Sequence, residues 1–329
     1  MSTNTEAFPD TPAPPTVARP RSVAEIREHT KRMPLDKIVE VVRSFKTRPT
    51  DIIVATFPKS GTTWMHQIVH GLRTRGSMDF EEIHMVVPFI DFSHIHGIDL
   101  DAPQVAEPRA FKTHLPWDRA PKGASYIYVV RDPGDALVSA YHFMNGAMFE
   151  RDSIDVNTYG QELFLAEGAY FGTYWSHLLS WWPQRTRDDV LFCCFEEMKR
   201  DLPGTVRRVA RFMGIEADPE LFDIATRQAS FEFMLQHVTK FDEHPFQQAM
   251  DRIKGVPPGK PLSKVRTGRV GDRMSELSEA TREALDAAWK REIEATLGFP
   301  SYDHLRAHIA AMPDHAGSIN RAHILRARP

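Results

Sequence analysis

The segment PKSGTT, residues 58–63, places a lysine, a glycine and three hydroxyl side chains between an apolar run and an amphipathic pattern. A loop that leads from a strand into a helix faces the free N–H groups and the positive dipole end of that helix. Gly61 lets backbone approach a ligand, and Lys59 can place an ammonium group on an anionic oxygen. Thr62 and Thr63 add hydroxyl donors. The segment predicts an anion site, with a simple helix-capping turn as the alternative.

The segment differs from the phosphate loop of nucleoside triphosphatases. That loop requires Gly-Lys-Ser/Thr, whereas Lys59 comes two residues before Gly61. The Gly-Lys pair of the chain, Gly259-Lys260, is followed by Pro261. The order of residues therefore argues against a triphosphate loop.

Four apolar stretches predict the strands that must position this loop. Residues 51–57, 126–130 and 190–195 are each followed by a polar loop and helical periodicity, and residues 110–113 suggest a further strand. Strands with nearly continuous apolar runs are buried on both faces, as in parallel sheets. We expect an α/β fold in which a single domain has a central parallel sheet flanked by helices.

The chain divides into a flexible N-terminal tail (residues 1–20), one domain (residues 21–300) and a peripheral C-terminal extension (residues 301–329). The tail is rich in Pro, Thr and Ala and has few large apolar groups. Residues 241–273 are rich in Pro, Gly and basic residues and lack clear periodicity, so we expect a long loop there.

Composition limits the partners and the compartment. Lysine and arginine number 41 against 44 acids, for a formal net charge of -3, so no bulk attraction for nucleic acid or anionic membrane is expected. Cys193 and Cys194 are the only cysteines, and we interpret them as reduced core residues of a strand. No segment has the pattern of a secretory signal or a membrane span, which predicts a cytoplasmic protein.

Several collinear motifs resemble those of the cytosolic sulfotransferases, and we expect a prokaryotic-type member. The first is RPTDIIVATFPKSGTTW, residues 48–64. The others are FKTHLP (111–116), YIYVVRDPGDALVSAYHF (126–143), YWSHLLSWW (174–182), VLFCCFEEMK (190–199) and VRTGRVGD (265–272). The resemblance covers about residues 45–299 and implies the fold of that family, which is similar to the P-loop nucleoside triphosphatases.

The resemblance also implies 3'-phosphoadenosine 5'-phosphosulfate as the co-substrate, and no metal. The residues that would hold its 5'-phosphosulfate side are Lys59, Ser60, Gly61, Thr62, Thr63 and Trp64. Those that would complete the nucleotide site are Arg131, Ser139, Phe195, Phe231, Arg266, Thr267 and Gly268. Trp64 and Phe231 would enclose the adenine, although Trp64 could instead be a core tryptophan. Arg131 would bind the 3'-phosphate, unless it forms a surface salt bridge with Asp132 or Asp135.

The histidine of FKTHLP, His114, would be the general base that takes the proton of the acceptor hydroxyl. Lys59 and Lys112 would stabilise the charge that develops on the leaving group during in-line displacement. His84, His94 and His96 have no cysteine or acid cluster at a recognised metal-site spacing, and we interpret them as loop or acceptor-pocket residues.

The resemblance implies a small-molecule acceptor with a hydroxyl group. Residues 84–100 and 142–152 fall where the family builds its acceptor pocket, and their Phe, Met and Ile residues suggest a lipophilic phenol, steroid or other alcohol. A homodimer is possible, but the dimer motif of the family is not visible. A kinase or nucleoside triphosphatase, or a non-catalytic nucleotide-binding module on the same fold, are the alternative functions.

Four positions depart from the pattern of the family. Phe195 stands where a tyrosine is usual, and Ala229 where a hydroxyl residue is common. Thr267 replaces a lysine of the 3'-phosphate loop, and Arg273 replaces a tryptophan.

Overall fold

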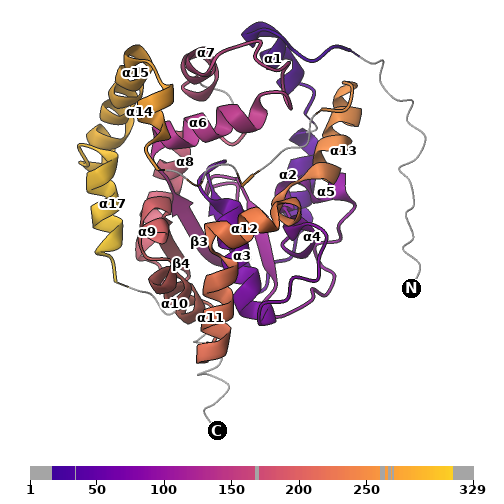
Figure 1. Ribbon diagram of the computed structural model, residues 1–329, viewed down its shortest axis with the longest axis vertical. Helices are drawn as coiled ribbons and strands as arrows, with labels where there is room; N and C mark the ends of the chain where they lie inside the picture. The colour runs from indigo at the N-terminus through magenta and orange to yellow at the C-terminus, as the bar shows by residue number, and fades with distance from the viewer. Residues whose placement is uncertain are drawn as a thin grey trace.

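The computed structural model describes residues 17–33, 35–166, 170–259, 264–265, 268 and 270–313 (Figure 1). Its strands are β1 (Ile52–Thr56), β2 (Ala110–Thr113), β3 (Ser125–Val130) and β4 (Val190–Cys194). Helices of eight residues or more are α1 (Val23–Thr30), α2 (Leu35–Ser44), α3 (Thr62–Thr74), α6 (Pro133–Met144), α8 (Tyr174–Trp181), α10 (Leu202–Phe212), α11 (Pro219–Gln228), α13 (His244–Lys254), α15 (Glu279–Trp289) and α17 (Tyr302–Ala310).

Shorter helical segments connect these elements. The α-helical ones are α4 (Ile83–Val86), α5 (Ser93–His96), α7 (Val156–Tyr159), α9 (Phe195–Arg200), α12 (Phe231–Gln236), α14 (Asp272–Glu276) and α16 (Ala295–Leu297). Three are 3-10 helices, η1 (Ile90–Phe92), η3 (Trp182–Thr186) and η4 (Val238–Phe241), and two are π-helices, η2 (Gly160–Phe164) and η5 (Lys290–Glu294). In the described part of the chain, no helix is both long and apolar enough to cross a membrane.

The four strands form one parallel sheet in the order β2-β1-β3-β4, which confirms the predicted fold class. Val54 of β1 pairs with Lys112 of β2 on one side and with Ile127 of β3 on the other. The chain passes from β1 to β2 at one side and then to β3 at the opposite side, so the strand order reverses at β1. Open α/β sheets bind ligands beyond the carboxyl ends of their strands at such a reversal.

Alternate strand residues pack against helices on opposite faces of the sheet. Ile53 and Ala55 lie in a core cluster with residues of α6, α8, α15 and α17. Ile52 and Val54 lie in a second cluster with residues of α3, α10 and α11. In Figure 1, α15 and α17 accordingly lie along one side of the molecule, and α10 and α11 lie at its lower end. The fold therefore has three layers, helices on both sides of the sheet.

The two cysteines follow the same alternation. Cys194 packs in the cluster with α6 and α8, whereas Cys193 packs in the cluster with α3 and α10. Both are buried and neither forms a disulfide bond, which confirms their interpretation as reduced core residues.

The prediction of a long loop over residues 241–273 is wrong for the first part of this range, because α13 begins at His244. The buried residues of this helix include Gln247, Asp251 and Lys254. Polar side chains on the buried face concealed the helical periodicity in the sequence. In Figure 1, α13 lies on the same side of the molecule as α2 and α5.

The segment from residue 301 onward also differs from the expectation of a peripheral extension. Tyr302, Leu305 and Ile309 of α17 are buried in the core cluster that covers one face of the sheet. The Tyr302 hydroxyl donates to the Glu196 carboxylate next to β4. The domain therefore continues to the end of α17, and residues 314–329 lie outside the described part.

Residues 17–20, which the sequence placed in the tail, are in contact with the domain. The guanidinium of Arg19 is buried, and its Nη2 donates to Oδ2 of Asp251 at 2.8 Å. The N–H of Val17 donates to the Gly255 carbonyl at 2.7 Å, and the Glu150 N–H donates to the Pro20 carbonyl at 2.7 Å. The packed part of the chain therefore begins before α1.

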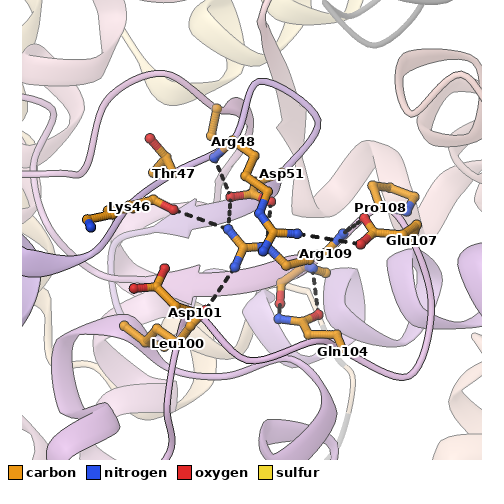
Figure 2. Close-up of polar contacts among 12 residues, drawn as sticks. Lys46, Thr47, Arg48, Asp51, Leu100, Asp101, Gln104, Glu107, Pro108 and Arg109 are labelled. Atoms are coloured by element: carbon orange, nitrogen blue, oxygen red, sulfur yellow. Dashed lines mark hydrogen bonds and ion pairs between the residues drawn. The ribbon is translucent and has the colours of Figure 1, made fainter.

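A buried ion pair joins the starts of β1 and β2 (Figure 2). Asp51 and Arg109 are both 0% exposed, and they meet through Nε–Oδ1 and Nη2–Oδ2 hydrogen bonds of 2.9 Å and 2.6 Å. The Arg48 N–H also donates to Oδ2 of Asp51 at 2.7 Å. Arg48 and Asp51 belong to the RPTD part of the first motif, which therefore holds the sheet together at the end opposite the PKSGTT loop.

Candidate functional site

A cavity of about 460 Å³ lies at the carboxyl ends of the strands. Its lining includes the side chains that the sequence singled out on β1, β2, β3 and the following loops. The predicted site residues among them are Lys59, Gly61, Thr62, Thr63, Trp64, Lys112, His114, Arg131, Ser139, Phe195, Phe231 and Gly268. Ser60 is fully buried rather than part of the lining, and Arg266 and Thr267 lie outside the described residues.

The N-terminus of α3 faces this cavity with its backbone donors uncapped. Gly61 is the N-cap residue, and because it has no side chain it makes no cap hydrogen bond to the first turn. Its φ of 97° lies in the left-handed region, and a Cβ there would lie 2.7 Å from the Phe195 ring, so both conformation and space require glycine. The hydroxyl of Thr62 is 2.7 Å from that of Thr56 and does not cap the helix. This arrangement favours an anion site over a self-satisfied capping turn.

Lys59 has a backbone conformation that is unusual for lysine. Its φ is 69°, in the left-handed region, which costs about 1–2 kcal/mol for a residue with a Cβ. Its Nζ lies 4.0 Å from the centroid of the Phe143 ring. Burial, followed by the charge of Lys264, lowers the pKa of Lys59 to about 7. An anion beside this amine would restore its charge, because an opposite charge favours the protonated form.

Aromatic side chains line the part of the cavity beside the first turn of α3. The Nε1 of Trp64 donates to the Ala229 carbonyl at 2.7 Å, which fixes the orientation of the indole. The ring of Phe195 meets that of Trp64 edge to face, with centroids 5.3 Å apart. Phe231 packs so closely on Gly268 that a Cβ at Gly268 would lie 2.7 Å from its ring. These surfaces suit a flat heterocycle.

Arg131 follows β3 directly and is buried at the cavity wall. Its Nη1 donates to the Lys59 carbonyl at 3.2 Å, and its guanidinium lies 4.2 Å from the centroid of the Phe195 ring. Asp132, one of the acids that could have paired with it, caps α6 and lies 3.5 Å from a guanidinium nitrogen of Arg273. Ser139 of α6 lines the same part of the cavity.

His114 lies just beyond the end of β2, and its tautomer follows from its hydrogen bonds. Its Nδ1 is 2.8 Å from the Thr56 carbonyl oxygen, which can only accept, so Nδ1 carries the proton. Nε2 is then the nitrogen with a free lone pair. Burial and the ammonium group of Lys112 hold the pKa of His114 well below its usual range. The imidazole is therefore neutral at pH 7 and can accept a proton.

Two buried groups fix the backbone around His114. The carboxylate of Asp91 accepts from the Thr113 hydroxyl at 2.6 Å and from the His114 N–H at 2.9 Å. Burial raises the pKa of Asp91 to about 6. The ring of His177 bonds through Nε2 to the His114 carbonyl at 3.1 Å. His114 is thus held through both its main-chain groups and its side chain.

Lys112 enters the cavity from β2 and is paired with an acid that the sequence did not single out. Its Nζ donates to Oε1 of Glu243 at 3.1 Å, and Lys264 forms an ion pair with the same oxygen. Burial alone would raise the pKa of Glu243, but the two ammonium groups outweigh it and hold that pKa well below its usual range. No local signal marks Glu243 or Lys264, because both fall in the segment predicted as a loop.

The cavity beside His114 is apolar. Phe89, Phe92, Phe171 and Phe246 line it, whereas Phe143 lines the cavity beside Lys59. The rings of Phe89 and Phe171 meet the imidazole edge to face, with centroids 5.1 Å and 5.7 Å away. Phe89 and Phe92 come from residues 84–100 and Phe246 from α13, and residues 142–152 contribute Phe143 and Met144 to the cavity lining.

The three histidines considered for a metal site do not line the cavity. His84 is buried in α4 and its ring centroid lies 4.6 Å from that of His96, which stacks on Phe246. His94 and His96 lie in α5. Within the described ranges, no group of three or more His, Cys, Asp or Glu side chains is arranged to hold a metal ion.

Comparison with known proteins gives consistent matches. Residues 49–297 match the family model of the sulfotransferase domain. Sulfotransferase 1B1 of Mus musculus is 31% identical over 275 residues, and sulfotransferase 1C2 of Rattus norvegicus is 30% identical over 268 residues. Each match covers 78% of this chain and 87% of the relative.

Solved structures share the fold at lower identity. Mouse sulfotransferase SULT7A1 complexed with PAP superposes with a TM-score of 0.61 at 21% identity, covering 84% of this chain and 94% of the other. Retinol dehydratase in complex with retinol and PAP gives a TM-score of 0.64 at 21% identity, covering 80% and 87%.

Proposed function

Because the chain belongs to the sulfotransferase family and is a sulfotransferase that uses 3'-phosphoadenosine 5'-phosphosulfate, we propose that it sulfates the hydroxyl group of a small lipophilic acceptor with His114 as the general base. The observation that carries the proposal is the Nδ1 hydrogen bond of His114 to the Thr56 carbonyl. This bond leaves Nε2 unprotonated at the cavity, between the anion loop and the apolar wall.

The residues of the cavity divide the work of the reaction. Nε2 of His114 takes the proton of the acceptor hydroxyl as its oxygen attacks sulfur and the bond from sulfur to the leaving phosphate oxygen breaks. The ammonium groups of Lys59 and Lys112 stabilise the negative charge that builds on that phosphate. No residue has to form a covalent intermediate in this in-line displacement.

The nucleotide end of the cavity fits the donor in its chemistry. The uncapped N-terminus of α3, with Thr62 and Thr63 in its first turn, would hold the 5'-phosphosulfate side. The guanidinium of Arg131, with Ser139, would hold the 3'-phosphate. Trp64, Phe195 and Phe231 would hold the adenine, and the predicted contributions of Arg266 and Thr267 remain part of the proposal. The scheme uses no metal ion.

The apolar wall around His114 supports a lipophilic acceptor. Four phenylalanines line the cavity there, so burial of a hydrocarbon or aromatic ring is favourable while the hydroxyl of the acceptor reaches Nε2. Related folds have been solved with retinol and with androsterone, both lipophilic alcohols, and these belong in an acceptor panel.

Two measurements test the proposal. We expect 3',5'-ADP to raise the melting temperature of the purified protein, and ATP at the same concentration to raise it much less. We then expect label transfer from ³⁵S-labelled donor to at least one member of a panel of phenols, steroids and retinol. Protection by ATP together with Mg²⁺-dependent ATP turnover would instead support a kinase or triphosphatase. Binding of 3',5'-ADP without transfer to any acceptor would support a binding module.

A further inference from the structure

Glu243 is a buried carboxylate inside a cavity that is built for an anion. It is 3% exposed and lies immediately before α13. The other acid of the lining, Glu232, is exposed to solvent. A carboxylate here opposes the binding of an anionic donor, and its burial carries a desolvation cost. Its presence therefore needs a compensating role.

The contacts of Glu243 show which groups it holds. Its Oε1 accepts from Nζ of Lys112 at 3.1 Å and also contacts Nζ of Lys264. The side chains of all three residues are at most 8% exposed. Lys112 lies on β2 two residues before His114, whereas Lys264 lies four residues before Gly268 of the nucleotide end. One carboxylate thus joins the strand that leads to the base with the segment that leads to the nucleotide.

The charges around the base give this contact a function. Five lysine and arginine residues line the cavity: Lys59, Lys112, Arg131, Lys199 and Lys264. The charge of Lys112 disfavours a proton on His114, whereas the charge of Glu243 favours one. The imidazole becomes positively charged when it takes the proton of the acceptor, and the negative charge of Glu243 stabilises that protonated form.

We propose that Glu243 is a positioning residue for sulfuryl transfer, which holds the ammonium groups of Lys112 and Lys264 beside the reacting centre and offsets their charge at His114, at the expense of nucleotide affinity. This inference rests on the proposed function and deepens it. A buried residue with a purely structural role would affect binding and turnover in the same direction. Glu243 should affect them in opposite directions.

The main test is Glu243→Gln, which preserves size and an accepting oxygen but removes the charge. We expect about tenfold tighter binding of 3',5'-ADP by isothermal titration calorimetry, because one negative charge near the bound anion is lost. We expect single-turnover transfer from the labelled donor to slow about 10- to 100-fold, because the lysines and the base are no longer held and balanced. Binding should be measured at pH 6, below the pKa of about 8 of Lys264 and the pKa of about 7 of Lys59.

Glu243→Asp separates charge from position and also serves if the glutamine variant fails to fold. It keeps the charge but draws the carboxylate back by one methylene. We expect 3',5'-ADP affinity within about twofold of the natural protein, together with slower transfer. The inference would be overturned if 3',5'-ADP binding weakened and turnover slowed together, either in both folded variants or in Glu243→Asp alone. It would also be overturned if turnover were unchanged in either variant.

Glu82→Gln is the matched control. Glu82 is also a buried carboxylate next to α13, where it accepts from the His244 N–H at 3.1 Å, but it does not line the cavity. Its substitution should leave 3',5'-ADP affinity and turnover within about twofold. If the natural protein neither binds 3',5'-ADP nor transfers label, the proposed function fails. If it does both and the Glu243 variants lack the opposed effects, only the role of Glu243 fails.

Discussion

Loss of the charge at Asp51 should destabilise the fold strongly, because it leaves the guanidinium of Arg109 buried without a counter-ion. Asp51→Asn removes one of the two charge-assisted hydrogen bonds outright and weakens the other, at about 1.5–3 kcal/mol each. Two neutral acceptors remain, the carbonyls of Leu100 at 3.0 Å and Lys46 at 3.2 Å. We therefore expect a loss of about 3–5 kcal/mol in the free energy of unfolding, the range for breaking a buried ion pair.

Urea unfolding followed by circular dichroism measures this loss. With a slope of about 3 kcal/mol/M for a domain of this size, the midpoint should fall by roughly 1–1.7 M. Glu107→Gln is the control, because Glu107 belongs to the same polar group in Figure 2 but its ion pair with Arg48 spans 3.8 Å at an exposed position. It should cost less than about 1 kcal/mol.

A double variant tests the reason for the loss. In Asp51→Leu with Arg109→Met, no buried charge remains, so much of the stability should return. A loss below about 1 kcal/mol in Asp51→Asn would refute the reasoning. A double variant less stable than Asp51→Asn would show that the hydrogen bonds, and not the uncompensated charge, dominate.

Three further predictions concern the cavity. His114→Ala should lower turnover about 10²- to 10⁴-fold while leaving the calorimetric affinity for 3',5'-ADP unchanged, and unchanged turnover would remove His114 from the mechanism. The affinity for 3',5'-ADP should fall as the pH rises through 7, where the amine of Lys59 with its pKa of about 7 loses its charge, and Lys59→Gln should flatten that part of the pH profile. Trp64→Ala should weaken 3',5'-ADP binding roughly 5- to 100-fold through lost stacking, with Trp64→Phe intermediate because it loses only the hydrogen bond to Ala229. Equal affinity of both Trp64 variants and the natural protein would place the indole outside the nucleotide site.

The strands and the loop that leads into α3 could be predicted because their signals are local. An apolar run followed by a polar loop and helical spacing identifies β1 and α3 without knowledge of the rest of the chain. Arg131 was predictable for the same reason, since it follows directly on the apolar run of β3. The reversal of strand order at β1 then brings together the loops that follow β1 and β3. The spacing of the motifs in the sequence does not predict this proximity.

The ion pair around Glu243 could not be predicted, because its partners meet only in the fold. Lys112 and Glu243 are 131 positions apart, and nothing near either residue indicates the other. The helix α13 was missed for a related reason: its buried Asp251 is compensated by Arg19, 232 positions away. A hydrophobic pattern in the sequence detects helices that bury apolar faces. It does not detect a helix whose buried face is polar because charged residues far away in the sequence form ion pairs with it.

Thr56, the last residue of β1, connects the loop that leads into α3 with His114, the proposed base. Its hydroxyl is 2.7 Å from that of Thr62 in the first turn of α3, and its carbonyl accepts from Nδ1 of His114 at 2.8 Å. β1 and β2 are neighbours in the sheet, so the parallel register fixes this distance. A donor held by the first turn of α3 and an acceptor aligned by Nε2 of His114 would then be placed relative to each other through a single buried residue. In-line transfer depends mainly on such positioning, which explains why the reacting groups follow the ends of adjacent strands rather than flexible loops.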